Sequence, residues 1–95
     1  MKHTVRRQVS EEEQRLWART CDAFASDPTR EQVNTTRIAQ RSLPIHEMRA
    51  RQIVRTWEND GLVTAVDNAN AVLLTEYGAQ VDTIEQEEAG GTSWR

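Results

Sequence analysis

One segment of this 95-residue sequence gathers side chains that can bind an anionic partner. Between Arg30 and Trp57 there are six arginines and only two acidic residues, Glu31 and Glu47. Arginine presents a planar fork of N–H donors that matches phosphate oxygens and the edge of guanine. This segment is therefore net positive. Because the formal net charge of the whole sequence is −3, the rest of the chain must be acidic. Charge separated in this way predicts a basic face and an acidic back.

A helix predicted over residues 45–60 carries half of these arginines. Residues placed 100° apart put Ala50, Ile53, Val54 and Trp57 on or beside one face, which should pack against other helices. The opposite face then displays Met48, Arg49, Arg51, Gln52 and Arg55. Such a face fits a nucleic acid, although arginines on a helix can also be no more than its solvated side.

Each of these side chains has an expected role if the face binds double-stranded DNA. Arg49 and Gln52, with Met48 between them, are expected to contact base edges, because Arg and Gln donate in pairs to guanine and adenine. Arg51 and Arg55 lie to one side and further back, where phosphate oxygens are the expected partners.

The sequence contains no arrangement of residues that supports catalysis or metal binding. Cys21, His3 and His46 do not have the spacing of zinc ligands, and Cys21 lies on an apolar helix face without a base beside it. The acidic run 11–13 fits a helix N-terminus, where negative charge is favourable. We therefore expect no enzyme activity, no metal and no cofactor.

A first helix is predicted from residue 10 to residue 26. Ser10 and Glu13 have the spacing of a capping box, in which each side chain bonds the other residue's N–H. The sequence Ser-Asp-Pro at 26–28 should end the helix, because proline disfavours helical geometry in the residue before it. Its apolar or small residues follow one helix face and are Leu16, Trp17, Thr20, Cys21 and Phe24.

The elements around the arginine-bearing helix are shorter. Residues 32–34 are a candidate for a brief strand, and Thr35 is a suitable cap for a short helix with Ile38 and Ala39 on its inner face. Pro44 suits the first turn of the next helix, and Gly61 suits the left-handed position after its end.

Two strands and a final helix complete the prediction. The runs 62–66 and 71–74 are strand-like, and the sequence Asp-Asn-Ala-Asn at 67–70 suits a hairpin tip between them. Thr75 is then a suitable cap for a helix in which Tyr77, Val81 and Ile84 recur at helical spacing. The fold class predicted is mainly α with a small β-hairpin, that is, α+β.

This order of elements resembles the winged helix-turn-helix domains of MarR-, PadR- and ArsR-like transcriptional regulators. Three segments carry the resemblance, namely 38–41, 53–63 and 73–78. They are similar to the family's leucine-alanine start of helix two, its leucine-acidic-x-x-glycine-leucine-valine exit from the recognition helix, and its leucine-threonine-x-x-glycine motif after the wing. Residues 33–81, about half of the chain, are covered by it.

The sequence departs from the family pattern at two places. The turn between helices two and three has Leu43-Pro44 where the family usually has glycine. The wing, residues 64–73, has no lysine or arginine. Its only amide donors are Asn68 and Asn70, so its contribution to DNA binding should be small. Arg37 and Arg41, on helix two, are expected to contact the neighbouring DNA backbone.

The resemblance implies sequence-specific binding of double-stranded DNA by a small regulator, a repressor that acts by occupying its operator. The alternative is a winged-helix module that binds another protein, which the overall acidity and the uncharged wing favour. We expect residues 1–9 to form a flexible basic arm, residues 10–87 the winged-helix domain, and residues 88–95 a disordered tail. The single cysteine and the lack of a signal peptide or membrane span favour the cytoplasm.

A symmetric dimer is also expected, since helix-turn-helix proteins commonly join two half-sites in this way. The candidate surface combines the apolar stripes of the two terminal helices. Its residues are Leu16, Trp17, Tyr77, Val81 and Ile84. The alternative is that both stripes pack on each other inside one monomer, because one contiguous core per domain is normal.

Overall fold

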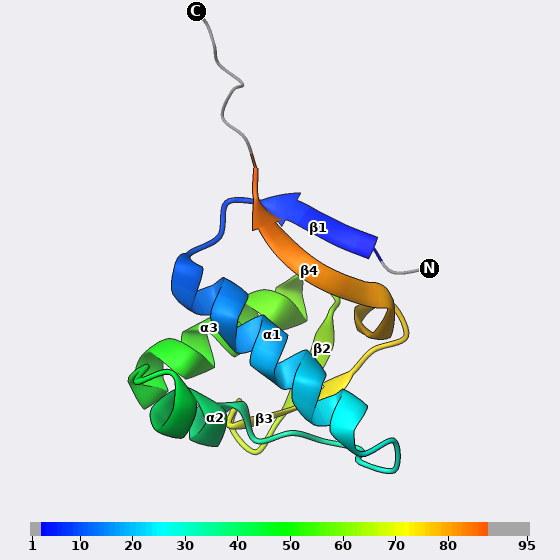
Figure 1. Ribbon diagram of the computed structural model, residues 1–95. Coiled ribbons are helices and arrows are strands. Elements are labelled where there is room, and N and C mark those ends of the chain that lie inside the picture. The colour runs from blue at the N-terminus through cyan, green and yellow to red at the C-terminus, as the bar shows by residue number, and fades with distance from the viewer. Residues whose placement is uncertain (1–2, 88–95) are drawn as a thin grey trace, which may run out of the picture.

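A computed structural model describes residues 3–87 of the chain (Figure 1). The predicted tail, residues 88–95, lies outside the described residues. The elements in chain order are β1 (His3–Arg7), α1 (Glu11–Ser26), α2 (Thr35–Ser42), α3 (Glu47–Asn59), β2 (Val63–Val66), β3 (Ala71–Leu74), a 3₁₀ turn (Gly78–Gln80) and β4 (Val81–Gln86). Three helices followed by a hairpin confirm the predicted α+β class.

The first two helices begin at side-chain caps, as the sequence predicts, but one cap is shifted. The Glu13 N–H donates to Ser10 Oγ at 3.1 Å at the start of α1. At the start of α2, the Arg37 N–H donates to Asn34 Oδ1 at 2.8 Å, so Asn34 and not Thr35 is the cap. Thr35 is instead buried, and its hydroxyl donates to the Asn70 carbonyl at 3.2 Å.

The turn between α2 and α3 closes without glycine. Ile45 is 3% exposed, and its N–H donates to the Ala39 carbonyl at 2.9 Å. His46 caps α3 by accepting the Met48 N–H on Nδ1 at 3.1 Å. The helix therefore begins two residues later than predicted, and Pro44 lies in the turn instead of the first helical turn. The buried Ile45 therefore fixes the turn between the two helices.

The β2–β3 hairpin has the predicted position, and residue 33 adds a bridge to it. Val63 pairs with Leu74 and Val66 with Ala71 in antiparallel register. Val33 and Val72 exchange two main-chain hydrogen bonds, of 3.0 and 2.9 Å, which confirms the brief strand as a single bridge. At the tip, residues 67, 68 and 69 have φ of 54°, 55° and 64°. Asn and Asp tolerate this left-handed region better than most residues.

Residues 3–7 and 81–86 form a parallel pair of strands, and both were predicted differently. His3–Arg7 is strand β1, not part of a flexible arm, and it pairs along β4. The predicted final helix is wrong, because residues 75–80 form a short connection that includes the 3₁₀ turn, and residues 81–86 form strand β4. The register moves from His3↔Val81 to Thr4↔Thr83, which leaves Asp82 as an extra residue. This bulge lets Val81 and Ile84 face the core at a spacing of three, which imitates a helix.

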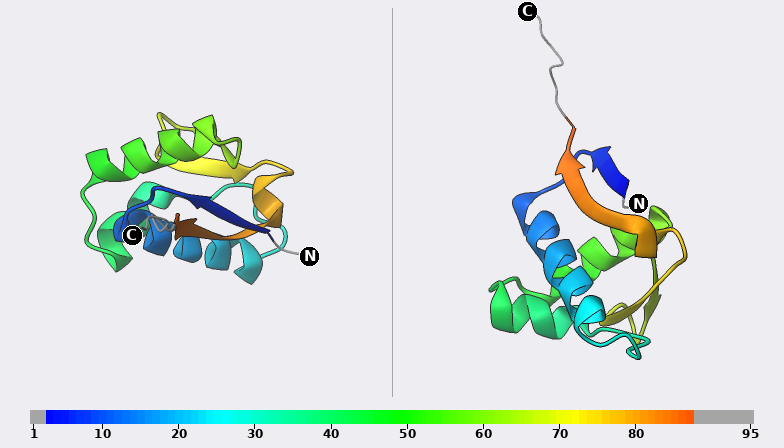
Figure 2. Two further views of the ribbon diagram at one scale, coloured as in Figure 1. Left: turned by 90° about the horizontal axis from the view of Figure 1, so that it is seen from above. Right: turned by 45° about the vertical axis from the view of Figure 1, so that its right-hand side comes forward.

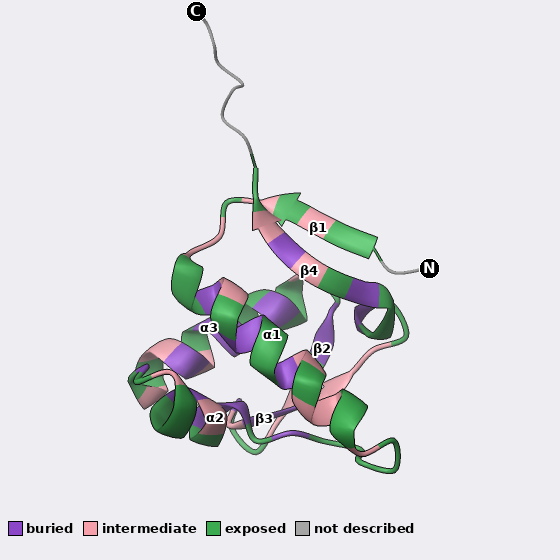
Figure 3. Cartoon of the chain, viewed as in Figure 1, coloured by how far each residue is buried: buried purple, intermediate pink, exposed green. Residues whose placement is uncertain are grey.

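The core lies between α1, α3 and the two pairs of strands (Figure 3). Figures 1 and 2 agree that β4 and α2 lie on opposite sides of α1. At its centre the rings of Trp17 and Trp57 meet edge to face, with centroids 5.0 Å apart. No helix within residues 3–87 is both long enough and apolar enough to cross a membrane.

Most of the residues predicted to form a dimer surface belong instead to the core of one molecule. Leu16, Trp17, Val81 and Ile84 are each no more than 2% exposed, and they pack within one molecule. A domain with so few apolar residues needs both stripes for its own core, so the predicted dimer surface is wrong at these four positions. Only Tyr77, which is 47% exposed, is accessible. Dimerisation itself stays a prediction.

Candidate nucleic-acid interface

The outer face of α3 presents one row of exposed side chains. Its members, in sequence order, are Met48, Gln52, Arg55 and Asn59, at helical spacings of four, three and four. The opposite face is buried at Ala50, Ile53, Val54 and Trp57, as predicted. Met48 is 61% exposed, and no acidic residue belongs to the row. We call these four residues the α3 row.

Arg49 is placed beside the α3 row and not in it. Its Nε donates to Glu12 Oε1 and its Nη2 donates to Ser10 Oγ, both at 3.1 Å. The guanidinium therefore lies against the N-terminus of α1, on one flank of α3. The predicted neighbourhood of Arg49, Gln52 and Met48 is divided by the structure, since only the last two share the exposed row.

Arg51 occupies the other flank, against the hairpin. Its Nη2 donates to Glu47 Oε2 at 2.8 Å, and its Nε donates to Asn70 Oδ1 at 2.9 Å. The same Asn70 oxygen accepts the Thr36 hydroxyl at 3.0 Å. Asn70 thus joins the hairpin tip to α2 and α3, and its side-chain oxygen is occupied inside the fold. Of the two asparagines predicted in the wing, only Asn68 is exposed.

Three arginines predicted to bind DNA are exposed. Arg37 and Arg41 lie one turn apart on α2, and Arg55 belongs to the α3 row. Within residues 3–87, none of the three makes an ion pair. These guanidinium groups can take a phosphate or a base edge without giving up a partner of their own.

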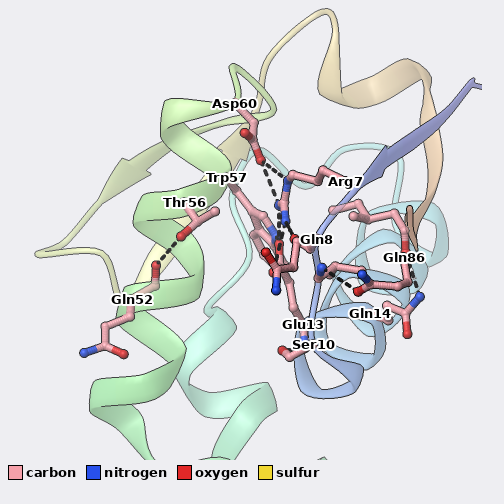
Figure 4. A network of polar contacts seen from close by, with 12 residues as sticks. Arg7, Gln8, Ser10, Glu13, Gln14, Gln52, Thr56, Trp57, Asp60 and Gln86 are labelled. Atoms are coloured by element: carbon pink, nitrogen blue, oxygen red, sulfur yellow. Dashed lines mark hydrogen bonds and ion pairs between the residues drawn. The ribbon is translucent and has the colours of Figure 1, made fainter. Parts of the chain in front are cut away.

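Sequence reasoning missed a polar network beside α3, which Figure 4 shows from close by. The Arg7 guanidinium forms a two-pronged ion pair with Glu13, and its Nε donates to Asp60 Oδ2 at 2.9 Å. The Trp57 indole N–H donates to Glu13 Oε2 at 2.9 Å. The hydrogen bond to Glu13 raises the pKa of the Arg7 guanidinium above its usual range, against the lowering effect of burial.

A signal for this network was present in the sequence. Glu13, Leu16, Trp17 and Thr20 share one helix face at spacings of three, one and three, and all four are buried. A carboxylate on a buried face requires a cation or several donors, because an unpaired buried charge is strongly unfavourable. The capping-box motif explained Glu13 by another bond, in which its side chain would return to residue 10. Of the two bonds of that box, the one that forms runs from the Glu13 N–H to Ser10 Oγ.

Two residues of the network, Arg7 and Glu13, line an open pocket of about 470 Å³. Ser10, Arg49, Thr56 and Gln86 line the same pocket. Gln52 lies one turn before Thr56 on α3, and its side chain points away from the network (Figure 4). The α3 row and the pocket therefore lie on different sides of the helix. Within residues 3–87, no three His, Cys, Asp or Glu side chains are close enough together to hold a metal ion.

Comparison with protein-family models, with curated proteins and with solved structures finds no match to this chain. The order of the three helices and the hairpin is compatible with a winged helix-turn-helix.

Proposed function

We propose that the chain is a winged helix-turn-helix domain that binds double-stranded DNA through α3. The single observation that supports this is the α3 row, four exposed side chains without an acid, on a helix that follows α2 after a tight turn. A helix of 13 residues is about 20 Å long and fits the major groove. In this proposal α3 is the recognition helix and the β2–β3 hairpin is the wing.

The row contains side chains suited to reading bases. Gln52 and Asn59 can each bond an adenine edge with two hydrogen bonds, and Arg55 can do the same with guanine. Met48 can make an apolar contact with a thymine methyl group. The proposal therefore moves Arg55 to base reading and Arg49 to phosphate contact, because Arg49 is held on a flank. In this proposal the exposed Arg37 and Arg41 on α2 contact phosphates beside the groove.

The mechanism proposed is steric. A domain seated in the major groove of an operator blocks access to an overlapping promoter, so no reaction is needed for repression. The hairpin contributes little to affinity, since its residues 64–73 include no lysine or arginine and Asn70 is engaged inside the fold.

Salt dependence of duplex binding tests this function. We expect affinity for a random-sequence duplex to fall steeply as salt rises, because each phosphate contact releases counterions. Arg37→Gln, at a proposed phosphate contact, should lower the slope of log affinity against log salt by about 0.9, whereas Arg55→Gln should relax base preference because Arg55 is proposed to read a base. Arg6→Gln is the control, since it removes the same charge on β1.

The second candidate function is a module that binds another protein. Two observations favour it: the hairpin lacks basic residues, and both flanking arginines are already paired with carboxylates. No measurable duplex binding at low salt would support this candidate and contradict DNA binding. Sedimentation equilibrium at micromolar concentration would test the predicted dimer, and a monomer mass would contradict it.

A further inference from the structure

The N-terminus of α1 places a carboxylate directly beside the proposed DNA-binding surface. Glu12 accepts a hydrogen bond from Arg49 Nε at 3.1 Å, and the two side chains are 50% and 40% exposed. Ser10 holds the same guanidinium through Nη2. The Glu12 carboxylate has no other hydrogen bond or ion pair within residues 3–87, although its charge also lies in the first turn of α1.

An exposed ion pair of this kind is weak and exchanges readily. Pairs in which both partners are accessible to water add little to stability, since solvent screens the attraction and ordering two long side chains costs entropy. A DNA phosphate near Arg49 would offer the guanidinium an equivalent anionic partner. The Glu12 carboxylate would then remain close to that phosphate, and like charges across an interface oppose binding.

We propose that Glu12 restrains the affinity of the domain for DNA by competing with phosphate for Arg49. This inference rests on the proposed DNA-binding function and assigns a residue that regulates the same surface. Glu12 acts through Arg49 and contacts no base, so its effect is the same for any DNA sequence. The pair keeps one guanidinium neutralised until a duplex displaces the carboxylate.

Glu12→Gln tests the proposal, because glutamine keeps an oxygen that can accept the Arg49 hydrogen bond and removes only the charge. We expect this variant to bind a random-sequence duplex about two- to fivefold more tightly than the parent, the range set by the strength of exposed ion pairs. Glu11→Gln is the matched control. It removes the same charge one residue earlier in α1, where Glu11 pairs with Arg15 at 3.4 Å.

A double-mutant cycle separates competition for Arg49 from a change in net charge. In the Arg49→Gln background, Glu12→Gln should improve binding by no more than Glu11→Gln does. A loss of affinity in Glu12→Gln would show that Glu12 positions Arg49 for DNA, which overturns the proposal. An equal gain in the two glutamate variants would overturn it as well. A parent protein that binds no duplex would contradict the proposed function and this inference together.

Discussion

At the scale of single residues, the two buried tryptophans differ in one bond. The Trp57 indole N–H donates to Glu13, which also pairs with Arg7. The Trp17 indole N–H is buried and has no hydrogen-bond partner within residues 3–87. An unpaired buried donor lowers stability, whereas a donor bonded to a carboxylate adds to it. The same side chain is therefore expected to contribute differently at the two positions.

Phenylalanine substitutions measure that difference. Trp57→Phe and Trp17→Phe remove the same atoms from the same core, but only the first takes a hydrogen-bond donor away from Glu13, whose carboxylate then keeps only Arg7. We expect Trp57→Phe to lower the free energy of unfolding by about 1–3 kcal/mol more than Trp17→Phe. Urea unfolding followed by circular dichroism at the helical band measures both. Equal losses would mean that the bond between Trp57 and Glu13 contributes nothing.

At the scale of elements, the sequence predicted what local signals determine. The Ser10 cap of α1 and the apolar spacing of α1, α2 and α3 were readable, as were the hairpin and its Asp-Asn-Ala-Asn tip, whereas the caps of α2 and α3 lie at other residues than predicted. The β1–β4 pair was not readable, because the partners of His3–Arg7 lie at the other end of the sequence. For the candidate site, the exposed face of α3 was predictable from its period. The flanking positions of Arg49 and Arg51 were not, since Glu12 and Asn70 belong to other elements.

The segment after β3 shows why one predicted motif requires glycine. The Thr75 hydroxyl donates to the Gly61 carbonyl at 2.6 Å and accepts the Gly78 N–H at 2.9 Å. These bonds hold the 3₁₀ turn close to the end of α3. A Cβ built on Gly78 would lie 1.8 Å from the Leu62 carbonyl oxygen, which is main chain and cannot rotate away. The glycine therefore allows the hairpin to close on α3.

Gly78→Ala should consequently be costly. We expect the free energy of unfolding to fall by about 1–3 kcal/mol or more, the usual cost of overpacking a tight contact. Gly61→Ala is the comparison, because a Cβ there meets open space and only the φ of 82° is strained, at about 1 kcal/mol. Thermal unfolding would rank the two variants. A Gly78→Ala protein as stable as Gly61→Ala would refute the close contact.

At the scale of the whole molecule, β1 joins three parts of the fold. Its Arg6 pairs with Glu85 on β4 at 3.2 Å, and its Arg7 pairs with Glu13 on α1 and with Asp60 after α3. The strand brings positive charge to a neighbourhood of carboxylates. It also pairs with β4 along its whole length, on the strand that carries the core residue Ile84.

Removal of residues 1–8 is therefore expected to destabilise the domain far more than loss of a surface pair. Loss of Arg7 leaves the buried Glu13 carboxylate without its cation, which costs about 3–5 kcal/mol in comparable buried pairs. Arg6→Gln, which removes only an exposed pair, should cost less than about 1 kcal/mol. The midpoint of urea unfolding measures both. If the shortened chain unfolds at the parent's midpoint, residues 3–7 are the flexible arm that the sequence had suggested.

Pairing the first and last described strands also has a consequence for the order of folding during synthesis. β1 leaves the ribosome before any other described element, yet its partner β4 is translated after the helices and the hairpin. Contacts between such distant segments form slowly, because a long loop has to close first. The helices and hairpin can assemble beforehand, since their neighbours are close in sequence. A nascent chain that ends before residue 81 should thus expose its Arg7 strand to proteases, and translation of β4 should protect it.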